Sequence, residues 1–362
     1  MSKTKFYSLR KILQKDAYYN VIFGERSNGK TFAVQEYGLK QYHDTGKQMA
    51  VVRRYQEDYT GKRGSTTFDG IVKSGRVAEI FAGEWTDIYY YASRWYLCRW
   101  EDGRRVQDEK PFAFGFALSS MEHDKSTNYP DITTVLFDEF LSRMAYLPDE
   151  FTLLMNVLST IIRHRRDVKI FMLGNTVNKY CPYFSEMGLK HVKEMKPGDI
   201  DVYRYGDSDL IVAVEYTKPN NEGKESDLYF AFDNPSLKMI TSGSWEIDIY
   251  PHCPEKFKPK DILFTYFIRF DDTLLQCEIV QTENNTFTFI HPKTTEMKNP
   301  ENEFIYSRDF SPNPKHFRNI TRPRTSIEKK IAEFYARDKV FYSDNETGEV
   351  VRNYLIWCGK DV

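Results

Sequence analysis

Two stretches of the sequence carry residue types that could bind and cleave a phosphate anhydride. The first is the G-x-x-x-x-G-K-T motif from Gly24 to Thr31, which follows an apolar run and precedes a helical pattern ending near Lys40. Its glycines permit tight turns that aim successive N–H groups, including those around Asn28 and Gly29, at phosphate oxygens, and the helix dipole adds positive potential. We expect Lys30 to reach the β- and γ-phosphates and the Thr31 hydroxyl to bind Mg²⁺.

The second stretch is the apolar segment Thr133–Phe140, which contains two consecutive acids, Asp138 and Glu139. A buried strand that ends in these acids would place Asp138 beside the phosphate-binding loop, where it would hold Mg²⁺, commonly through water. Glu139 would orient and deprotonate an attacking water. An apolar strand ending in acids is weak evidence alone, but after a complete phosphate-binding loop it predicts a hydrolytic site.

Polar residues also follow two other predicted strands. Asn175 comes after the apolar run Lys169–Gly174 and could hydrogen-bond the attacking water or the γ-phosphate. Arg53 and Arg54 end the strand 48–52, where an arginine could sense nucleotide or simply form a solvated strand end.

The arginines at 163, 165 and 166 follow a predicted helix over 150–162. This helix end lies opposite the phosphate end of the sheet in the predicted topology. The cluster is therefore better placed to reach a neighbouring subunit, where an arginine would stabilise transition-state charge. The alternative is a solvated helix terminus that complements the dipole.

These residues must be positioned by alternating strands and helices, which predict an α/β fold. Two further features are expected in this part of the chain. Residues 87–105 predict a β-hairpin with an Asp-Gly turn signal, and the polar segment Gln56–Gly75 predicts a mobile loop. Lys62 and Arg63 in that loop are candidates for DNA-backbone contacts, although a solvated loop is equally consistent.

The second part of the chain has a different pattern. A Pro- and Gly-containing polar stretch, 217–226, has the composition of a linker. A three-strand meander over 261–291, a helix opened by the capping-box signal Thr325–Glu328, and a final strand over 350–357 are then expected. A basic cluster could bind nucleic acid or form a solvated face; it comprises Lys315, Arg318, Arg322, Arg324, Lys329 and Lys330.

Composition places limits on these interpretations. The 362 residues suffice for two domains, and the net charge of −1 means that nucleic-acid contacts must come from local patches such as Arg322 and Arg324. The five cysteines are scattered without metal-binding or disulfide spacing, which favours a reducing compartment. We find no run of 18 apolar residues and no signal peptide, so we expect a protein that is neither membrane-spanning nor secreted.

Several motifs together resemble the DNA-packaging ATPase of phi29-like podophages. Their order and spacing are preserved over about residues 5–180, whereas beyond residue 220 only the layout is similar. The matching motifs are Phe6-Tyr7, the loop from Gly24 to Thr31, the strand end Val52–Tyr55, Lys125-Ser126 with Tyr129-Pro130, the acids of Phe137–Phe140, Arg163–Arg165, and Gly174-Asn175.

The resemblance implies an additional-strand, catalytic-glutamate (ASCE) ATPase domain, a linker and a small ribonuclease H-like C-terminal domain. We place them at 1–216, 217–257 and 258–362. It also implies a homopentameric ring at the portal of an empty prohead that drives double-stranded DNA inward, with a packaging RNA as scaffold. Such a motor would lie in the host cytoplasm, docked transiently on the prohead and absent from the mature virion.

The resemblance also assigns roles to individual arginines. Arg165 matches the arginine that completes a neighbour's site, Arg53 a nucleotide-sensing arginine, and Arg26 a basic residue of the phosphate-binding loop. A nuclease of the terminase type needs an acid within the first strand of its C-terminal domain, but 262–270 contains none. Asp271 and Asp272 fall in the next turn, so we expect no nuclease activity.

Three functions remain open at this point. The first is a ring ATPase that moves DNA, with ATP and Mg²⁺ bound by the residues above. The second is a small-molecule P-loop kinase, which must exclude water and would not favour Glu139 as a poised base. The third is a non-enzymatic DNA- or capsid-binding protein with a relic nucleotide site, which the complete set Lys30, Thr31, Asp138 and Glu139 disfavours.

Overall fold

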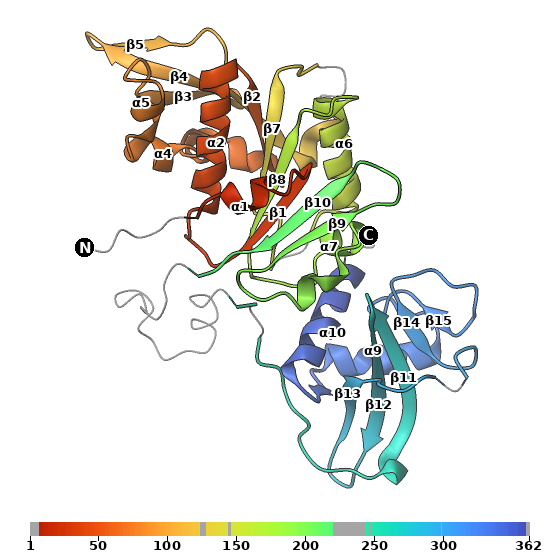
Figure 1. The fold of residues 1–362 in the computed structure, drawn as a ribbon. Helices are drawn as coiled ribbons and strands as arrows, with labels where there is room; N and C mark the ends of the chain where they lie inside the picture. Colours follow the sequence, from red (N-terminus) through yellow and green to blue (C-terminus); the bar gives the residue numbers. More distant parts are fainter. Residues whose placement is uncertain are drawn as a thin grey trace. The chain divides into compact units, whose positions relative to one another are not determined.

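The chain forms two compact units, Met1–Glu246 and Ile247–Val362 (Figure 1). The computed structural model describes residues 7–123, 128–143, 146–219, 244–245, 248–297 and 299–359. Of the motif residues named above, Phe6, Lys125 and Ser126 lie outside this range, as does most of the predicted linker, from 220 to 243.

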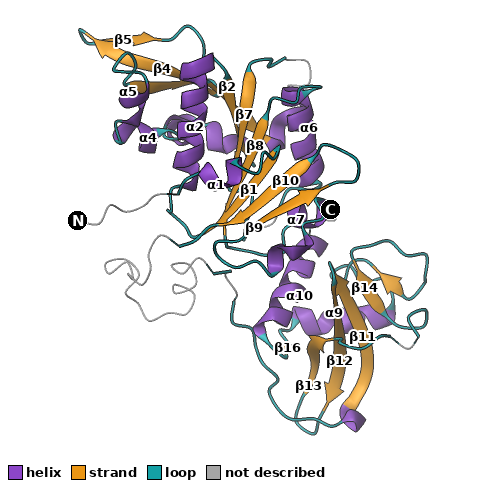
Figure 2. Ribbon diagram, viewed as in Figure 1, coloured by secondary structure: helices purple, strands orange, loops and turns teal. Residues whose placement is uncertain are grey.

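The first unit contains one ten-stranded sheet with the order β3-β4-β6-β2-β7-β8-β1-β10-β9, and β5 pairs with β4. Its strands, coloured orange in Figure 2, are β1 (Tyr19–Gly24), β2 (Gln48–Arg53), β3 (Asp87–Tyr91), β4 (Arg94–Glu101), β5 (Arg104–Gln107), β6 (Ala113–Ala117), β7 (Ile132–Asp138), β8 (Lys169–Asn175), β9 (Ile200–Arg204) and β10 (Ile211–Tyr216).

The six central strands are parallel, and β3, β4, β5 and β9 are antiparallel additions at the edges. Gly24 at the end of β1 pairs with Asn175 at the end of β8, and Asp138 at the end of β7 pairs with Leu173. The carboxyl ends of these strands therefore meet at one edge, where ligands bind in open α/β sheets.

Helices cover both faces of this sheet, so the unit has three layers (Figure 2). On one face pack α1 (Arg10–Leu13), α2 (Lys30–Thr45), α4 (Asp69–Lys73) and α5 (Arg76–Ile80), with Ile12, Val34, Leu39, Ile71 and Val77 fully buried. On the other pack α6 (Glu150–Ile162) and α7 (Pro182–Glu186), which bury Leu154, Val157 and Tyr183. Short 3-10 turns complete the unit: η1 (Gln56–Tyr59), η2 (Leu118–His123) and η3 (Lys190–Lys193).

One prediction for this unit was wrong, and another was correct but incomplete. Residues 56–75 are not a mobile loop but consecutive short helices: η1, α3 (Gly61–Ser65) and α4. The polar composition concealed Tyr59, Phe68 and Ile71, which are buried and anchor the segment to the sheet. The hairpin over 87–105 was correct for β3 and β4, and β5 adds a third antiparallel strand after the Asp102-Gly103 turn.

The second unit is a six-stranded sheet with the order β15-β14-β11-β12-β13-β16. Its elements are η4 (Pro259–Asp261), β11 (Ile262–Phe270), β12 (Thr273–Gln281), β13 (Thr286–Pro292), β14 (Ile305–Ser307), β15 (His316–Phe317), α9 (Ser326–Ala336), β16 (Val340–Tyr342) and α10 (Asn345–Cys358). The predicted meander and the capped helix are confirmed: Thr325 accepts a hydrogen bond from the Glu328 backbone N–H.

The predicted final strand over 350–357 was wrong, because these residues belong to α10. Asp344 caps the helix by accepting a hydrogen bond from the Thr347 N–H, and Val350, Val351 and Tyr354 are buried on one face. Within the described part of the chain, no helix is long and apolar enough to cross a membrane.

Candidate nucleotide site

The loop between β1 and α2 has the backbone conformation of an anion-binding nest. Ser27 and Gly29 have positive φ angles of 58° and 93°, which turn neighbouring N–H groups toward a common centre. Gly24 has φ 152°, and a Cβ added there would lie 2.1 Å from the Thr217 hydroxyl oxygen. That hydroxyl in turn accepts a hydrogen bond from the Asn28 amide (2.9 Å), so the absence of a side chain at Gly24 allows this support of the loop.

Lys30 is buried at the wall of this site. Its ammonium donates to the Glu25 carbonyl (2.6 Å), the Asn28 side-chain oxygen (3.2 Å) and the Asn175 side-chain oxygen (3.4 Å). Burial lowers the pKa of Lys30 to about 8, although the carboxylates of Asp138 and Glu25 oppose the shift. A cation that is poorly solvated by water gains strongly from a phosphate at the same place.

Thr31 and Asp138 face each other across the site. The Thr31 hydroxyl lies 3.2 Å from both carboxylate oxygens of Asp138. Burial raises the pKa of Asp138, and the Arg53 guanidinium opposes this shift. One hydroxyl and one carboxylate fit Mg²⁺, which takes one or two protein oxygens and completes its octahedron with water and substrate phosphates. Among the described residues, no group of three or more His, Cys, Asp or Glu could hold a metal ion by itself.

Glu139 has an unusual backbone conformation for a non-glycine residue, with φ 61°. Its side chain is 71% exposed, and one carboxylate oxygen lies 3.2 Å from the Arg53 guanidinium. That contact is made by one terminal nitrogen of Arg53, and the second terminal nitrogen lies 3.2 Å from an Asp138 carboxylate oxygen. Arg53 therefore links the two predicted acids.

These side chains surround one cavity of about 260 Å³. Of the predicted site residues, Asn28, Gly29, Lys30, Thr31, Asp138, Glu139 and Asn175 line it. Gly24 supports the loop from behind, Arg53 contacts the acids, and Arg26 is exposed on the loop outside the lining. Ser27, Phe32, Leu173 and Gly174 also line the cavity but were not predicted.

Arg165 is remote from this cavity, as the predicted topology required. Its guanidinium donates to four backbone carbonyls of its own chain, those of Pro130 (2.9 Å), Tyr129 (3.3 Å), Ile161 (3.0 Å) and Ile132 (2.5 Å). These contacts join the end of α6 to the amino end of β7, a structural role that the sequence did not indicate.

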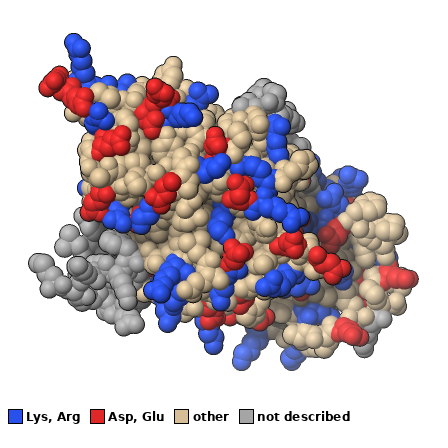
Figure 3. Space-filling model, turned by 45° about the horizontal axis from the view of Figure 1, so that its top comes forward, with Lys and Arg blue, Asp and Glu red and all other residues tan. Residues whose placement is uncertain are grey.

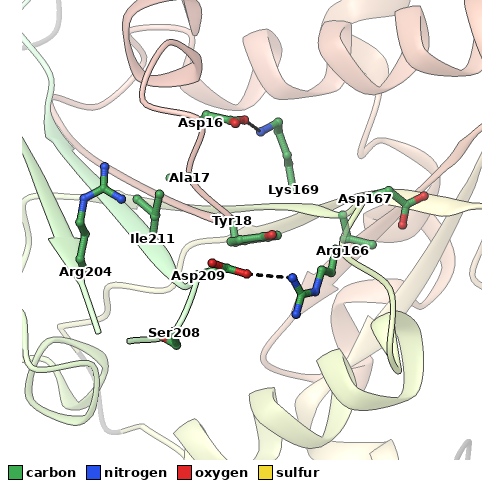
Figure 4. A pocket seen from close by; sticks show the side chains of 11 residues that line it. Asp16, Ala17, Tyr18, Arg166, Asp167, Lys169, Arg204, Ser208, Asp209 and Ile211 are labelled. Carbon is green, nitrogen blue, oxygen red and sulfur yellow. Dashed lines mark hydrogen bonds and ion pairs between the residues drawn. The ribbon is translucent and has the colours of Figure 1, made fainter. Parts of the chain in front are cut away.

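A second cavity, of about 390 Å³, lies at the amino ends of β1, β8 and β10 (Figure 4). Arg166 from the arginine cluster points across it and forms an ion pair with Asp209 (2.8 Å), and Lys169 pairs with Asp16 (2.9 Å). Its lining carries both signs of charge, so it shows no preference for an anionic ligand.

The four basic residues proposed to contact nucleic acid are all exposed but belong to different units. Lys62 and Arg63 lie on α3, whereas Arg322 and Arg324 precede α9. On the face drawn in Figure 3, lysine and arginine are interspersed with aspartate and glutamate. Among the described residues of each unit taken by itself, that face therefore shows no continuous basic track of the kind that marks an electrostatic footprint for nucleic acid.

Part of the chain matches a known protein family. The family model described as "Podovirus DNA encapsidation protein (Gp16)" matches residues 1–79 and 100–197, just under half of the chain. The predicted resemblance is confirmed. The unmatched residues 80–99 include β3 and most of β4, so this edge hairpin lies outside the family pattern.

Individual relatives agree with the family match. The DNA packaging protein of Bacillus phage phi29 is 29% identical over 187 residues, which are 51% of this chain and 50% of the relative. The corresponding protein of Bacillus phage B103 is 28% identical over 181 residues, 49% of this chain and 50% of the relative. The match thus spans about half the length of these relatives.

Two solved structures extend the likeness to nearly the whole chain. The phi-28 gp11 DNA packaging motor has a TM-score of 0.55 at 18% identity and covers 99% of both chains. The bacteriophage phi-29 genome packaging motor assembly has a TM-score of 0.55 at 20% identity, with 96% coverage of both. At these identities the likeness shows the fold alone. Together with the phosphate-binding loop between β1 and α2, it identifies an α/β P-loop fold.

Proposed function

We propose that this chain is an ATPase that moves double-stranded DNA into a phage prohead. The observation that carries the proposal is the convergence of Lys30, Thr31, Asp138, Glu139 and Asn175 on one cavity at the carboxyl edge of the sheet. The relatives named as DNA packaging proteins supply the biological context. Together they favour hydrolysis that is coupled to DNA movement over a metabolic reaction.

The residues suggest a specific division of roles. Mg²⁺ held by Thr31 and Asp138 would neutralise charge on the β- and γ-phosphate oxygens. Glu139 accepts a proton from water as that water attacks the γ-phosphorus, and the bond from phosphorus to the β–γ bridging oxygen breaks to release ADP and phosphate. Lys30 binds the β- and γ-phosphates, Asn175 hydrogen-bonds the attacking water or γ-phosphate, and Arg53 senses the nucleotide through both acids.

The strand order supports the additional-strand, catalytic-glutamate class for the N-terminal domain. β8 lies between β1, which carries the phosphate-binding loop, and β7, which carries Asp138 and Glu139. That extra strand separates the two motifs and brings Asn175 between them, because β8 pairs with both neighbours.

For the C-terminal domain, we propose a vestigial ribonuclease H-like fold joined through a linker over 217–257. The order β13-β12-β11-β14-β15, with three antiparallel strands followed by two parallel ones, supports it. The two final strands are very short, and the described residues show no helix between β13 and β15. β11 carries no acid and Asp271 lies in the following turn, so we propose that the domain lacks nuclease activity.

We further propose that the active unit is a homopentameric ring docked on the prohead portal in the host cytoplasm, with a packaging RNA as scaffold. Arg165 would then complete the neighbouring subunit's site, which requires it to exchange carbonyls of its own chain for phosphate. Arg26, on the exposed loop, would contact nucleotide, while Lys62, Arg63, Arg322 and Arg324 are candidates for DNA contact.

The test is phosphate release by the purified chain with ATP and Mg²⁺, compared with Glu139→Gln. We expect turnover in the wild type and a loss of at least about 100-fold in the variant, with ATP binding retained, because only the proton acceptor is removed. Transfer of phosphate to a metabolite without hydrolysis would instead indicate a kinase. Binding without any turnover would indicate a relic site.

A further inference from the structure

A buried ion pair lies directly behind the proposed catalytic glutamate. Arg54, which directly follows β2, meets Glu150, the first residue of α6, in a bidentate contact. Arg54 Nε lies 2.8 Å from one carboxylate oxygen, and a terminal nitrogen lies 2.9 Å from the other. The side chains are 10% and 0% exposed. Such pairs add little net stability, since desolvation offsets attraction, so stability alone does not account for this one.

The same guanidinium holds the backbone at the proposed base. Arg54 donates to the Glu139 carbonyl (3.3 Å) and to the Phe140 carbonyl (3.0 Å). Glu139 has φ 61°, a left-handed conformation that is unfavourable for a non-glycine residue and persists only where the surroundings enforce it. Arg54 supplies two of those constraints.

Glu150 is fully satisfied and tied to further elements. One carboxylate oxygen also accepts from the Tyr183 hydroxyl (2.7 Å) on α7, and the other from the Leu147 N–H (2.7 Å). The Tyr146 ring packs 5.1 Å from the Arg54 guanidinium carbon. Each oxygen therefore has two donors, and the pair joins β2, the segment after β7, α6 and α7.

We propose that Arg54 and Glu150 are positioning residues that fix the Glu139 backbone in its left-handed conformation and so aim the carboxylate at water in the cavity. The inference rests on the proposed function, because it assigns Glu139 the role of base. It adds a mechanical link: a shift of the first turn of α6 displaces Glu150, then Arg54, then Glu139. Events at α6 would thereby switch hydrolysis without changing the nucleotide-binding loop.

The test is a comparison of kcat and ATP affinity in Arg54→Met. We expect kcat to fall by about 10- to 100-fold, since misplacement of a catalytic group by about 1 Å costs that much, and ATP affinity to change less than about twofold. Arg76→Met is the matched control, because it breaks an Arg–Glu pair between α5 and α2 (Arg76–Glu36, 2.7 Å) far along the chain from Glu139. It should leave kcat unchanged.

A second comparison separates positioning from general stability. Replacing both partners by apolar residues, Arg54→Met with Glu150→Leu, should recover most of any lost thermal stability but not kcat. In a Glu139→Gln background, Arg54→Met should cause no further loss of the residual rate. A stable double variant with wild-type kcat, or an equal fold-loss in both backgrounds, would overturn the proposal.

If the proposed function is wrong, the experiments give a result that differs from failure of the positioning role. If the wild type does not hydrolyse ATP, the role of Glu139 as base is wrong. Amide hydrogen exchange near Glu139 and Phe140 still tests the structural link in that case. Exchange there should rise in Arg54→Met but not in Arg76→Met, and unchanged exchange in both would refute the link.

Discussion

At the scale of single residues, the site depends on groups held in conformations or environments that they would not adopt alone. Lys30 is buried with its pKa lowered to about 8, Asp138 is buried with its pKa raised, and Glu139 occupies left-handed backbone space. Strained or desolvated groups of this kind cluster at functional sites because the surrounding fold enforces them.

Gly24 offers a residue-scale test of that enforcement. Gly24→Ala places a Cβ against the Thr217 hydroxyl at φ 152°, so we expect a loss of more than about 2 kcal/mol in the free energy of unfolding and weaker ATP binding. Gly46→Ala is the matched control: its φ is also positive, at 69°, but nothing lies within 4 Å of the added Cβ. Equal losses measured by chemical denaturation would contradict the steric argument.

At the scale of elements, the sequence predicted the strands whose ends carry the site, because apolar runs ending in polar residues are local signals. It did not predict which strands are neighbours: the place of β8 between β1 and β7 depends on contacts between distant segments. The Arg54–Glu150 pair was missed for the same reason, since its members are 96 positions apart. No local pattern marks such a contact.

The wrong assignment of α10 has a different physical cause. Val350 and Val351 favour a strand by intrinsic preference, and the buried spacing Val350, Val351, Tyr354 is too short to decide between periods. The deciding feature is the cap at Asp344, which begins the helix six residues earlier. Tertiary packing and capping together outweigh the strand preference of two valines.

A cross-strand pair in the second unit predicts a pH dependence. The Glu278 carboxylate on β12 lies 3.5 Å from the His291 imidazole on β13, which raises the pKa of His291 and lowers that of Glu278. The contribution of His291 to stability is complete below its ordinary pKa of 6.5 and is lost as pH rises through its raised pKa. The glutamate contribution is complete above its ordinary pKa of 4.5 and is lost as pH falls through its lowered pKa.

The pair should therefore stabilise the second unit most between about pH 4.5 and 6.5. As pH rises above 6.5, part of the fall in melting temperature comes from this pair. That part should be absent in His291→Gln when thermal melts are recorded over this pH range. Titration of the His291 imidazole by NMR measures the raised pKa directly. An ordinary or lowered pKa would contradict the ion pair.

At the scale of the whole molecule, the proposed role of Arg165 means that the site is completed by a neighbouring chain. Arg165→Ala should lower ATP hydrolysis if it acts in a neighbour, but it also removes four hydrogen bonds within its own chain and should reduce stability. Mixing stable Arg165→Ala chains with Glu139→Gln chains distinguishes these effects. Interfaces that combine an intact Arg165 with an intact Glu139 should restore part of the activity, and no recovery at any ratio would contradict a shared site.

We propose that hydrolysis at Glu139 drives DNA movement. The most direct test measures how much DNA is protected from nuclease inside proheads of the cognate phage. With ATP, Mg²⁺ and double-stranded DNA, the wild-type chain should protect DNA while releasing phosphate. Glu139→Gln should bind ATP and protect none. Phosphate release without protected DNA in the wild type, or protection by Glu139→Gln equal to that of the wild type, would contradict the account.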